Sequence, residues 1–197
     1  MVKWSIILFS VLLLSVSVFS QGGGKDCKGI FRWEVKTLTD SGGVVLLSAR
    51  IYDSTLAHLV SVHPPKHFFI LSKKDSRLPR YETEKYLVKV VAIIQEVKVQ
   101  KDQDLHIILK SPDSDDTMIG EIPDPGCRVF DSLPGLRAVF QKARQELELA
   151  GIPGKTSGKQ VLVEITGVPF WDARHWWLRG CARNGREIHP ILSVKIL

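Results

Sequence analysis

EKYLVKVVAIIQEVKVQKDQDLHIILKSPDSDDTMIGEI, residues 84–122, carries the clearest structural pattern in the chain. It predicts three consecutive antiparallel strands, over about 85–99, 105–110 and 117–122. Two polar turns, at 101–104 and 111–116, separate them. The first strand is apolar on both faces, which is typical of a strand shared between the two halves of a small barrel.

One helix and two strands follow this stretch. The segment 134–150 predicts a helix whose apolar residues recur at helical spacing: Leu136, Val139, Phe140, Ala143 and Leu147. Asp131 or Ser132 is expected to cap it, and Gly151 to end it. We expect a strand over 160–166, a long loop over 167–185 and a last strand over 186–197.

The predicted order of elements is strand, strand, strand, helix, strand, strand. That order indicates a mainly β protein with an OB-fold-like five-stranded barrel over residues 84–197. Residues 30–83 form an N-terminal extension that we expect to pack on the barrel. Within it, the alternation of Phe31–Thr39 predicts a strand, 44–51 a second strand, and 54–60 a short helix.

The N-terminus has the features of a secretory signal peptide. Lys3 precedes an apolar run, Ile6–Val18, and Ser20 supplies a small residue for cleavage. The run is shorter than the roughly 20 residues that a spanning helix needs, although an uncleaved anchor remains the alternative. We therefore expect a signal peptide over 1–20, a flexible leader over 21–29, and a secreted or periplasmic protein without a transmembrane segment in its mature chain.

Charge and cysteine content set broad limits on the function. The net charge of +6 falls to +5 when Lys3 leaves with the signal peptide, since +6 − 1 = +5. This modest excess permits nucleic-acid, anionic-glycan or membrane partners without requiring any. The three cysteines allow one disulfide with one thiol left over, in three pairings. We favour Cys27–Cys127, because it closes a long loop.

Two short motifs place histidines beside carboxylates. Strand alternation puts Asp104 with His106 on one strand face, and Glu187 with His189 on another. If the strands are neighbours, His106, Glu187 and His189 converge, with His175 or Glu121 nearby. Such donors suit zinc or another transition metal, which could activate water. The other interpretation is a purely structural polar cluster, so the cofactor stays open, with a divalent metal as the candidate.

The loop FWDARHWWLRGCARNGR, residues 170–186, is rich in rings and guanidinium groups. In an OB-fold this loop flanks the binding face, where aromatic rings stack on bases or sugars and arginines contact phosphates. The candidate ligand contacts are Trp171, Arg174, Trp176, Trp177 and Arg179. The alternative is that the tryptophans plug one end of the barrel.

Five blocks of the sequence resemble a family of uncharacterised, secreted bacterial proteins. They are RWEVKT at 32–37, DLHIIL at 104–109, TMIGEIPDPGC at 117–127, ITGVPF at 165–170 and NGREIHP at 184–190. The resemblance implies no activity, but Cys27 and Cys127 match positions where the family is expected to have cysteines, which supports their pairing. The chain departs from the family pattern in the loop 171–183, where it has Trp171-Asp172, His175-Trp176 and an additional Cys181.

The sequence therefore predicts a secreted OB-fold-like binding module, leaning away from an enzyme. Its expected ligand is a single-stranded nucleic acid or a glycan, bound by the barrel face and the loop 170–186. One alternative is a metal-dependent, phosphodiesterase-like hydrolase that uses the His/Glu residues. The other is a structural or protein-interaction domain of the cell envelope.

Overall fold

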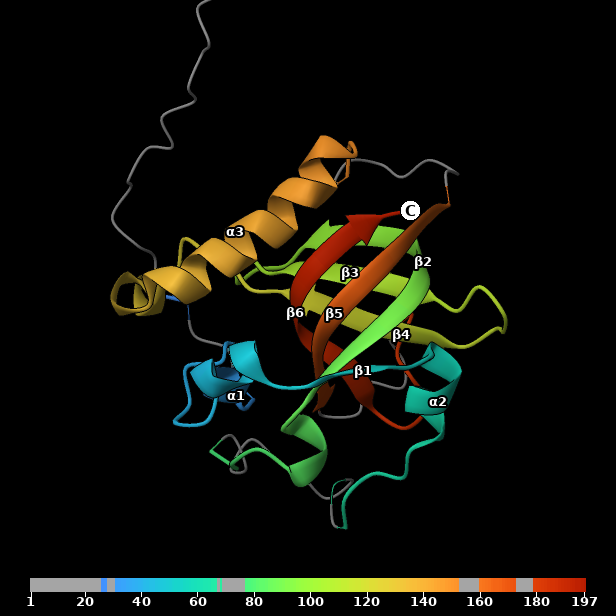
Figure 1. The fold of residues 1–197 in the computed structure, drawn as a ribbon, viewed down its shortest axis with the longest axis horizontal. Coiled ribbons are helices and arrows are strands. Elements are labelled where there is room, and N and C mark those ends of the chain that lie inside the picture. The colour runs from blue at the N-terminus through green and yellow to red at the C-terminus, as the bar shows by residue number, and fades with distance from the viewer. Residues whose placement is uncertain (1–25, 28–30, 67, 69–76, 153–159, 173–178) are drawn as a thin grey trace, which may run out of the picture.

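The computed structural model describes residues 26–27, 31–66, 68, 77–152, 160–172 and 179–197 (Figure 1). Its elements are α1 (Trp33–Lys36), the 3₁₀ helix η1 (Val44–Ser48), β1 (Ile51–Asp53), α2 (Leu56–Ser61), the 3₁₀ helix η4 (Glu82–Glu84), β2 (Leu87–Val99), β3 (Leu105–Lys110), β4 (Thr117–Ile122), the 3₁₀ helix η5 (Arg128–Ser132), α3 (Pro134–Leu149), β5 (Val161–Trp171) and β6 (Arg186–Ile196).

Five of the strands close into a barrel. Their order is β2-β3-β4-β6-β5, and β5 pairs back onto β2. The β4–β6 pair is parallel, whereas the other four pairs of the barrel are antiparallel. Helix α3 connects β4 to β5, so the predicted OB-fold-like order of elements is confirmed. The short β1 is an additional strand that pairs in parallel with the start of β2.

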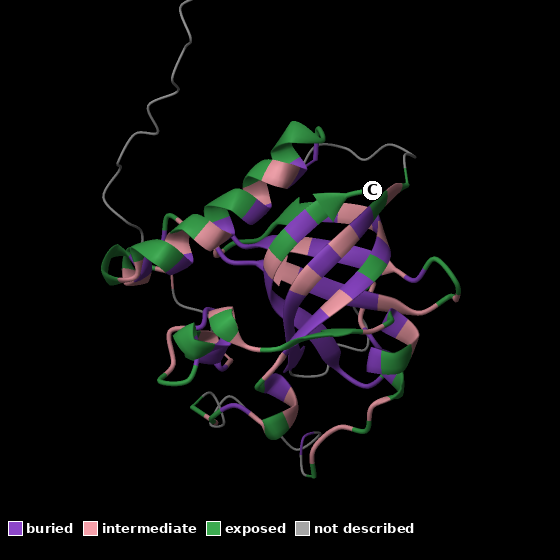
Figure 2. Cartoon of the chain, in the orientation of Figure 1, coloured by how far each residue is buried: buried purple, intermediate pink, exposed green. Residues whose placement is uncertain are grey.

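The length of β2 explains its apolar pattern. The strand has 13 residues, and its first half pairs with β5 from Val88 to Ile94. Its second half pairs with β3 from Ile93 to Val99. Residues along β2 therefore contribute to both halves of the barrel, as predicted, and Figure 2 shows the barrel strands as largely buried.

Helix α3 packs one face against the barrel. Its apolar stripe is buried, with Leu136, Phe140, Ala143 and Leu147 at most 2% exposed. Arg144 fixes the helix at the barrel end, because its guanidinium donates to the carbonyl oxygens of Gln103, Ile122 and Pro123. Gly151 follows the helix with a φ of +74°, a conformation that favours glycine.

The prediction that Asp131 or Ser132 caps this helix is wrong. Leu133 occupies the N-cap position and makes no side-chain capping bond. Asp131 instead pairs with Arg137 in the first turn of the helix. Pro134 tolerates the missing cap, because proline has no backbone N–H to satisfy at this position.

The two strands predicted in the N-terminal extension are also wrong. Residues 33–36 form a helical turn and 44–48 form a 3₁₀ helix, and among the described residues of the extension only 51–53 form a strand. The chain turns at Arg32 and Leu38, whose φ angles are 46° and 57°, and a strand does not accommodate such angles. The predicted short helix is confirmed as α2, where Thr55 accepts a hydrogen bond from the backbone N–H of His58.

A buried ion pair fixes the extension to the barrel. Arg32 binds Glu84 through both guanidinium Nη atoms, at 2.8 and 2.5 Å, and both side chains are fully buried. Glu84 also accepts the backbone N–H groups of Trp171 and Tyr81. The extension is therefore held where β5 ends and β6 begins, at the end of the barrel away from α3 (Figure 1).

A disulfide joins Cys27 to Cys127 across 100 residues of sequence, as favoured from the sequence. Cys181 is a free thiol of intermediate burial. Within the described residues, no helix is both long and apolar enough to cross a membrane. The predicted signal peptide, residues 1–20, and most of the leader lie outside the described residues.

Candidate functional site

The candidate site lies on the outer face of β3, β4 and β6. Strand alternation points Leu105 and Ile107 into the barrel, so His106 between them points outward. Glu121 is the register partner of His106 on β4, and it also faces outward. The parallel pairing of β4 with β6 brings Glu187 and His189 alongside, although both are buried.

We name these side chains the His–Glu cluster. Its members are Asp104, His106, Glu121, Glu187 and His189, together with Lys36 of α1 and Asp172 at the end of β5. The cluster therefore combines residues from the barrel with one residue from the extension.

Glu121 bridges the two histidines. His106 Nδ1 lies 2.8 Å from Glu121 Oε1, and His189 Nδ1 lies 3.0 Å from Glu121 Oε2. His189 Nδ1 is also 3.8 Å from Glu187 Oε2. The structure thus brings together four of the five residues proposed from the sequence for this cluster. The fifth, His175, lies outside the described residues.

The extension covers one side of the cluster. Lys36 Nζ donates to Asp172 Oδ2 at 3.0 Å and lies 5.3 Å from the centre of the Phe170 ring. The same ring contacts His189 edge to face, with centroids 5.7 Å apart. The His106 and Glu121 side chains keep 12% and 15% exposure, against 1% for His189. Solvent therefore reaches the cluster at its His106 end.

Burial raises the pKa of two carboxyl groups in the cluster. Burial, reinforced by repulsion from Asp172, raises the pKa of Glu187 to about 7. Burial likewise raises the pKa of Asp104 to about 6, although the charge of His189 opposes this rise. The positive charge near Glu187 and Asp104 does not compensate for their burial, so the ionised form of each carboxyl group costs free energy.

Three further groups of the cluster, His189, Glu121 and Lys36, are held in their charged forms. Burial opposes the imidazolium of His189, yet attraction to Glu121 raises its pKa to about 9. Burial also opposes the ionised Glu121, but the two histidines lower its pKa well below the ordinary value. The carboxylates raise the pKa of Lys36 despite its burial. Lys36 and His189 thus offset two of the four carboxylates.

Three ligand-type atoms of the cluster meet closely. One atom each from Asp104, Glu121 and His189 lies within 4.8 Å of the others. His189 is within ion-pair distance of Glu121, but in the described part of the chain neither of its ring nitrogens has a partner with hydrogen-bond geometry. This donor set of two carboxylates and one imidazole suits a divalent transition metal.

The closest set differs from the one expected. The sequence favoured His106, Glu187 and His189, whereas Asp104 and Glu121 join His189 instead. His106 hydrogen-bonds Glu121 from the solvent side. Strand alternation places Asp104 on the same strand face as His106, so the sequence contains a signal for Asp104. No sequence signal points to Lys36 or Asp172.

Trp171, the residue at the end of β5 that the sequence predicts as a ligand contact, belongs to the core. Trp171 is fully buried, with its ring 5.4 Å from that of Phe68 and its Nε1 donating to Thr83. The Arg186 guanidinium stacks on it at 4.5 Å. Trp171 is therefore buried between the extension and the start of β6 and offers no exposed ring face to a ligand, which corrects its interpretation as a ligand contact.

The remaining predicted ligand contacts lie in the loop between β5 and β6. Arg179 is 76% exposed, and its Nη1 is 3.8 Å from Glu96 Oε2. Arg174, Trp176 and Trp177 lie outside the described residues. Of the predicted ligand contacts in this loop, the structure therefore describes Arg179 alone, which is exposed and lies near Glu96 of β2.

Comparison of the chain with protein-family models, curated proteins and solved structures found no match. The resemblance to a family of secreted bacterial proteins therefore stays a prediction. The functional argument depends on the geometry of the His–Glu cluster.

Proposed function

We propose that this OB-fold-like barrel is a binding module with a divalent-metal centre, held by Asp104, Glu121 and His189. The observation that carries the proposal is the approach of their ligand atoms to within 4.8 Å of one another, from β4, β6 and the turn before β3 of a closed barrel. Two of the three ligands lie on strands, which hold side chains more rigidly than loops do and favour a preformed site.

A metal would draw the three ligand atoms closer together. Nitrogen and oxygen ligands bind zinc at about 2.0–2.2 Å, so in a tetrahedral site two ligands of one ion stand about 3.3–3.6 Å apart. The three atoms lie within 4.8 Å of one another, so a pair near that bound would have to close by about 1 Å. Rotation of the Asp104 and Glu121 side chains about their torsion angles would supply this movement. Zinc and manganese are the ions that these donors favour.

Electrostatics support the same proposal. The four carboxylates of the cluster exceed its two strongly held cations, Lys36 and His189. In a low-dielectric environment, an excess of negative charge attracts a cation more strongly than it would in water. A divalent ion would displace the proton from His189. It would also stabilise the ionised form of Asp104, whose pKa is raised without the ion.

His106 has a supporting place in this arrangement. Its bond to Glu121 Oε1 leaves Oε2, the oxygen nearest His189, directed toward the proposed ion. Hydrogen bonds from outside a metal's ligands commonly orient them in this way. We therefore assign His106 as a positioning residue rather than a ligand.

The test is metal binding by calorimetry, with elemental analysis of the dialysed protein. Wild type is expected to bind about one equivalent of Zn²⁺ or Mn²⁺. Asp104→Asn, which keeps the oxygen that accepts the Asp124 N–H, is expected to lose at least tenfold in affinity. Asp115→Asn is the control, since its carboxylate is exposed and contacts Lys110. Equal binding by all three proteins would remove the proposal.

A bound metal would also make hydrolysis feasible. Such an ion lowers the pKa of its bound water and supplies a nucleophile near neutral pH. The exposed His106 edge is the side from which a phosphodiester would approach. The measurement is metal-dependent cleavage of bis(p-nitrophenyl) phosphate by wild type but not by Asp104→Asn. Metal binding without cleavage would leave a binding module and exclude the phosphodiesterase.

A second candidate function is binding of a single-stranded nucleic acid or a glycan on the same outer face. Arg179 favours it, because its exposed guanidinium lies 3.8 Å from Glu96 of β2, the strand next to β3, on the loop that flanks an OB-fold binding face. Fluorescence anisotropy with a labelled oligonucleotide should then show binding that weakens with salt and with Arg179→Ala. If neither oligonucleotides nor glycans bind, a structural or protein-interaction domain of the envelope becomes the better description.

The proposed location of the protein is outside the cytoplasm. The Cys27–Cys127 disulfide supports it, because disulfides persist in oxidising compartments. Expression of the full chain in a secreting bacterial host, followed by N-terminal sequencing, tests the proposal. A mature protein that begins at Gln21 is the expected result, and an intact Met1 in the cytoplasm would contradict it.

A further inference from the structure

Resting on the proposed metal centre, we infer that Lys36 is a built-in counter-ion that competes with the metal and sets its affinity. Lys36 belongs to α1 in the extension, whereas the three proposed ligands belong to the barrel or to the turn that precedes β3. The extension therefore supplies one positive charge to a site that it does not otherwise build.

The Lys36 ammonium lies within the field of the cluster. It donates to Asp172 at 3.0 Å, and the next strongest attractions on it come from Glu121 and Glu187. Glu121 is one of the proposed metal ligands. The ammonium and a metal ion would thus share one set of carboxylates, so each weakens the binding of the other.

The position of α1 does not depend on Lys36. Arg32, just before the helix, is bound to Glu84 at 2.8 and 2.5 Å. Arg80 donates to the backbone oxygen of Val35 at 2.7 Å and pairs with Asp40. Removing the Lys36 charge should therefore leave the helix in place and change the electrostatics of the cluster alone.

The chemistry of the ammonium explains the competition. It is a compact point charge with three donors and no acceptor, so it can neutralise a carboxylate but cannot bind a metal ion. Repulsion between a unit charge and a nearby dication is about four times stronger at an effective dielectric constant of about 20 than in bulk water. Loss of the charge should strengthen metal binding on the order of tenfold or more.

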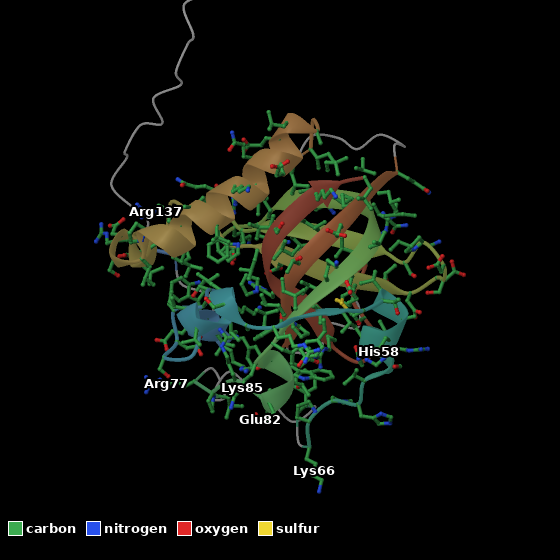
Figure 3. All side chains as sticks on the ribbon, viewed as in Figure 1. His58, Lys66, Arg77, Glu82, Lys85 and Arg137 are labelled. Atoms are coloured by element: carbon green, nitrogen blue, oxygen red, sulfur yellow. A yellow bond between two sulfur atoms is a disulfide. The ribbon has the colours of Figure 1, made fainter. Side chains whose placement is uncertain are left out.

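The test compares the Zn²⁺ or Mn²⁺ affinity of four variants by calorimetry. Lys36→Met and Lys36→Gln remove the charge, and the glutamine keeps a donor for Asp172. Both are expected to bind the ion at least tenfold more tightly than wild type. Lys36→Arg keeps the charge and should match wild type. Lys85→Met should also match wild type. Lys85 is 51% exposed and pairs with Glu82 in the lower part of Figure 3.

The outcomes separate this inference from the proposed function. Binding by wild type and all Lys36 variants with equal affinity overturns the role of Lys36 and leaves the metal centre intact. Weaker binding by Lys36→Met and Lys36→Gln also overturns it. Absence of binding in every protein overturns both proposals. Binding by the charge-removing variants alone supports the role of Lys36 but contradicts the proposal that wild type holds a metal.

A measurement on wild type covers the case in which the charge-removing variants do not fold. The NMR signals of the Lys36 side chain are followed with and without saturating Zn²⁺, with those of Lys85 as the control. If the metal draws Glu121 away from Lys36, the signals of the Lys36 CεH₂ group should shift on metal binding while those of Lys85 do not. Metal binding that leaves the Lys36 signals unchanged would overturn the inference.

Discussion

The Arg32–Glu84 pair and the His–Glu cluster are both buried and charged, but they differ in how far their partners satisfy them. All five N–H groups of Arg32 are used, by Glu84 and by the carbonyls of Leu78, Pro79 and Trp171. The cluster has more carboxylates than firmly held cations, and His189 lacks hydrogen-bond geometry to any described residue.

This difference indicates that the Arg32–Glu84 pair is structural and that the His–Glu cluster is the candidate functional site. A fully bonded pair with matched charges has nothing left to offer a ligand, and it holds the extension on the barrel. A buried group of atoms without full partners costs stability in the apo protein, and such groups are concentrated at functional sites. We therefore expect damage to the first to unfold the protein and changes to the second to alter what it binds.

The largest expected effect comes from breaking the satisfied pair. Arg32→Met leaves the Glu84 carboxylate buried without its cation, which should lower the free energy of unfolding by about 3–5 kcal/mol. Urea unfolding measures this loss, and the double variant with Glu84→Gln, which removes the unpaired charge but keeps an acceptor for the backbone N–H of Trp171 or Tyr81, should recover part of it. A loss below about 1 kcal/mol in the single variant would show that the pair does not hold the extension.

The next effect is a pH dependence that comes from the cluster. The pKa of Glu187 is raised in the folded protein to about 7, and that of His189 to about 9. Each raised pKa stabilises the fold below the group's unfolded pKa, and this contribution is lost as the pH rises through the folded value. The free energy of unfolding should therefore fall by on the order of a few kcal/mol between about pH 5 and pH 9.

Glu121 and Lys36 do not contribute to this pH dependence between pH 5 and 9. Glu121, whose pKa is lowered, adds stability only above its unfolded pKa, and Lys36, whose pKa is raised, loses its contribution only above 10.5. Neither interferes between pH 5 and 9. His189→Gln should flatten the upper part of the profile, while Asp115→Asn leaves it unchanged. A profile that rises through this window would contradict the assigned charges.

The smallest effect has the opposite sign. Glu187→Gln removes a carboxylate that Asp172 and Glu121 repel, and should raise the free energy of unfolding at pH 8 by on the order of 1 kcal/mol. Chemical denaturation checks it, with Glu34→Gln in the exposed first turn of α1 as the matched control. A loss as large as that of Arg32→Met would place Glu187 among the structural residues.

The same contrast explains how much the sequence could predict. The barrel follows from local patterns, because Leu105, Ile107 and Leu109 recur at every second position between clear turns. His106, Glu121, Glu187 and His189 could be assembled from strand alternation and the expected order of strands. The bridging position of Glu121 needed only the β3–β4 register.

The extension could not be predicted in this way. Its segment 31–39 fits a two-residue period, yet its path depends on the positive φ of Arg32 and on a partner 52 residues away, Glu84. Long-range pairing leaves no local signature. Lys36 therefore looked like an exposed residue of a strand, and its place in the cluster became visible only in three dimensions.

The most direct test of the central claim is Zn²⁺ or Mn²⁺ binding to wild type and to Asp104→Asn, measured by calorimetry on metal-free protein at one pH. The metal centre predicts about one equivalent bound by wild type and at least tenfold weaker binding by the variant. Wild type that binds no ion, or a variant that binds as tightly as wild type, would show that the His–Glu cluster is a structural network.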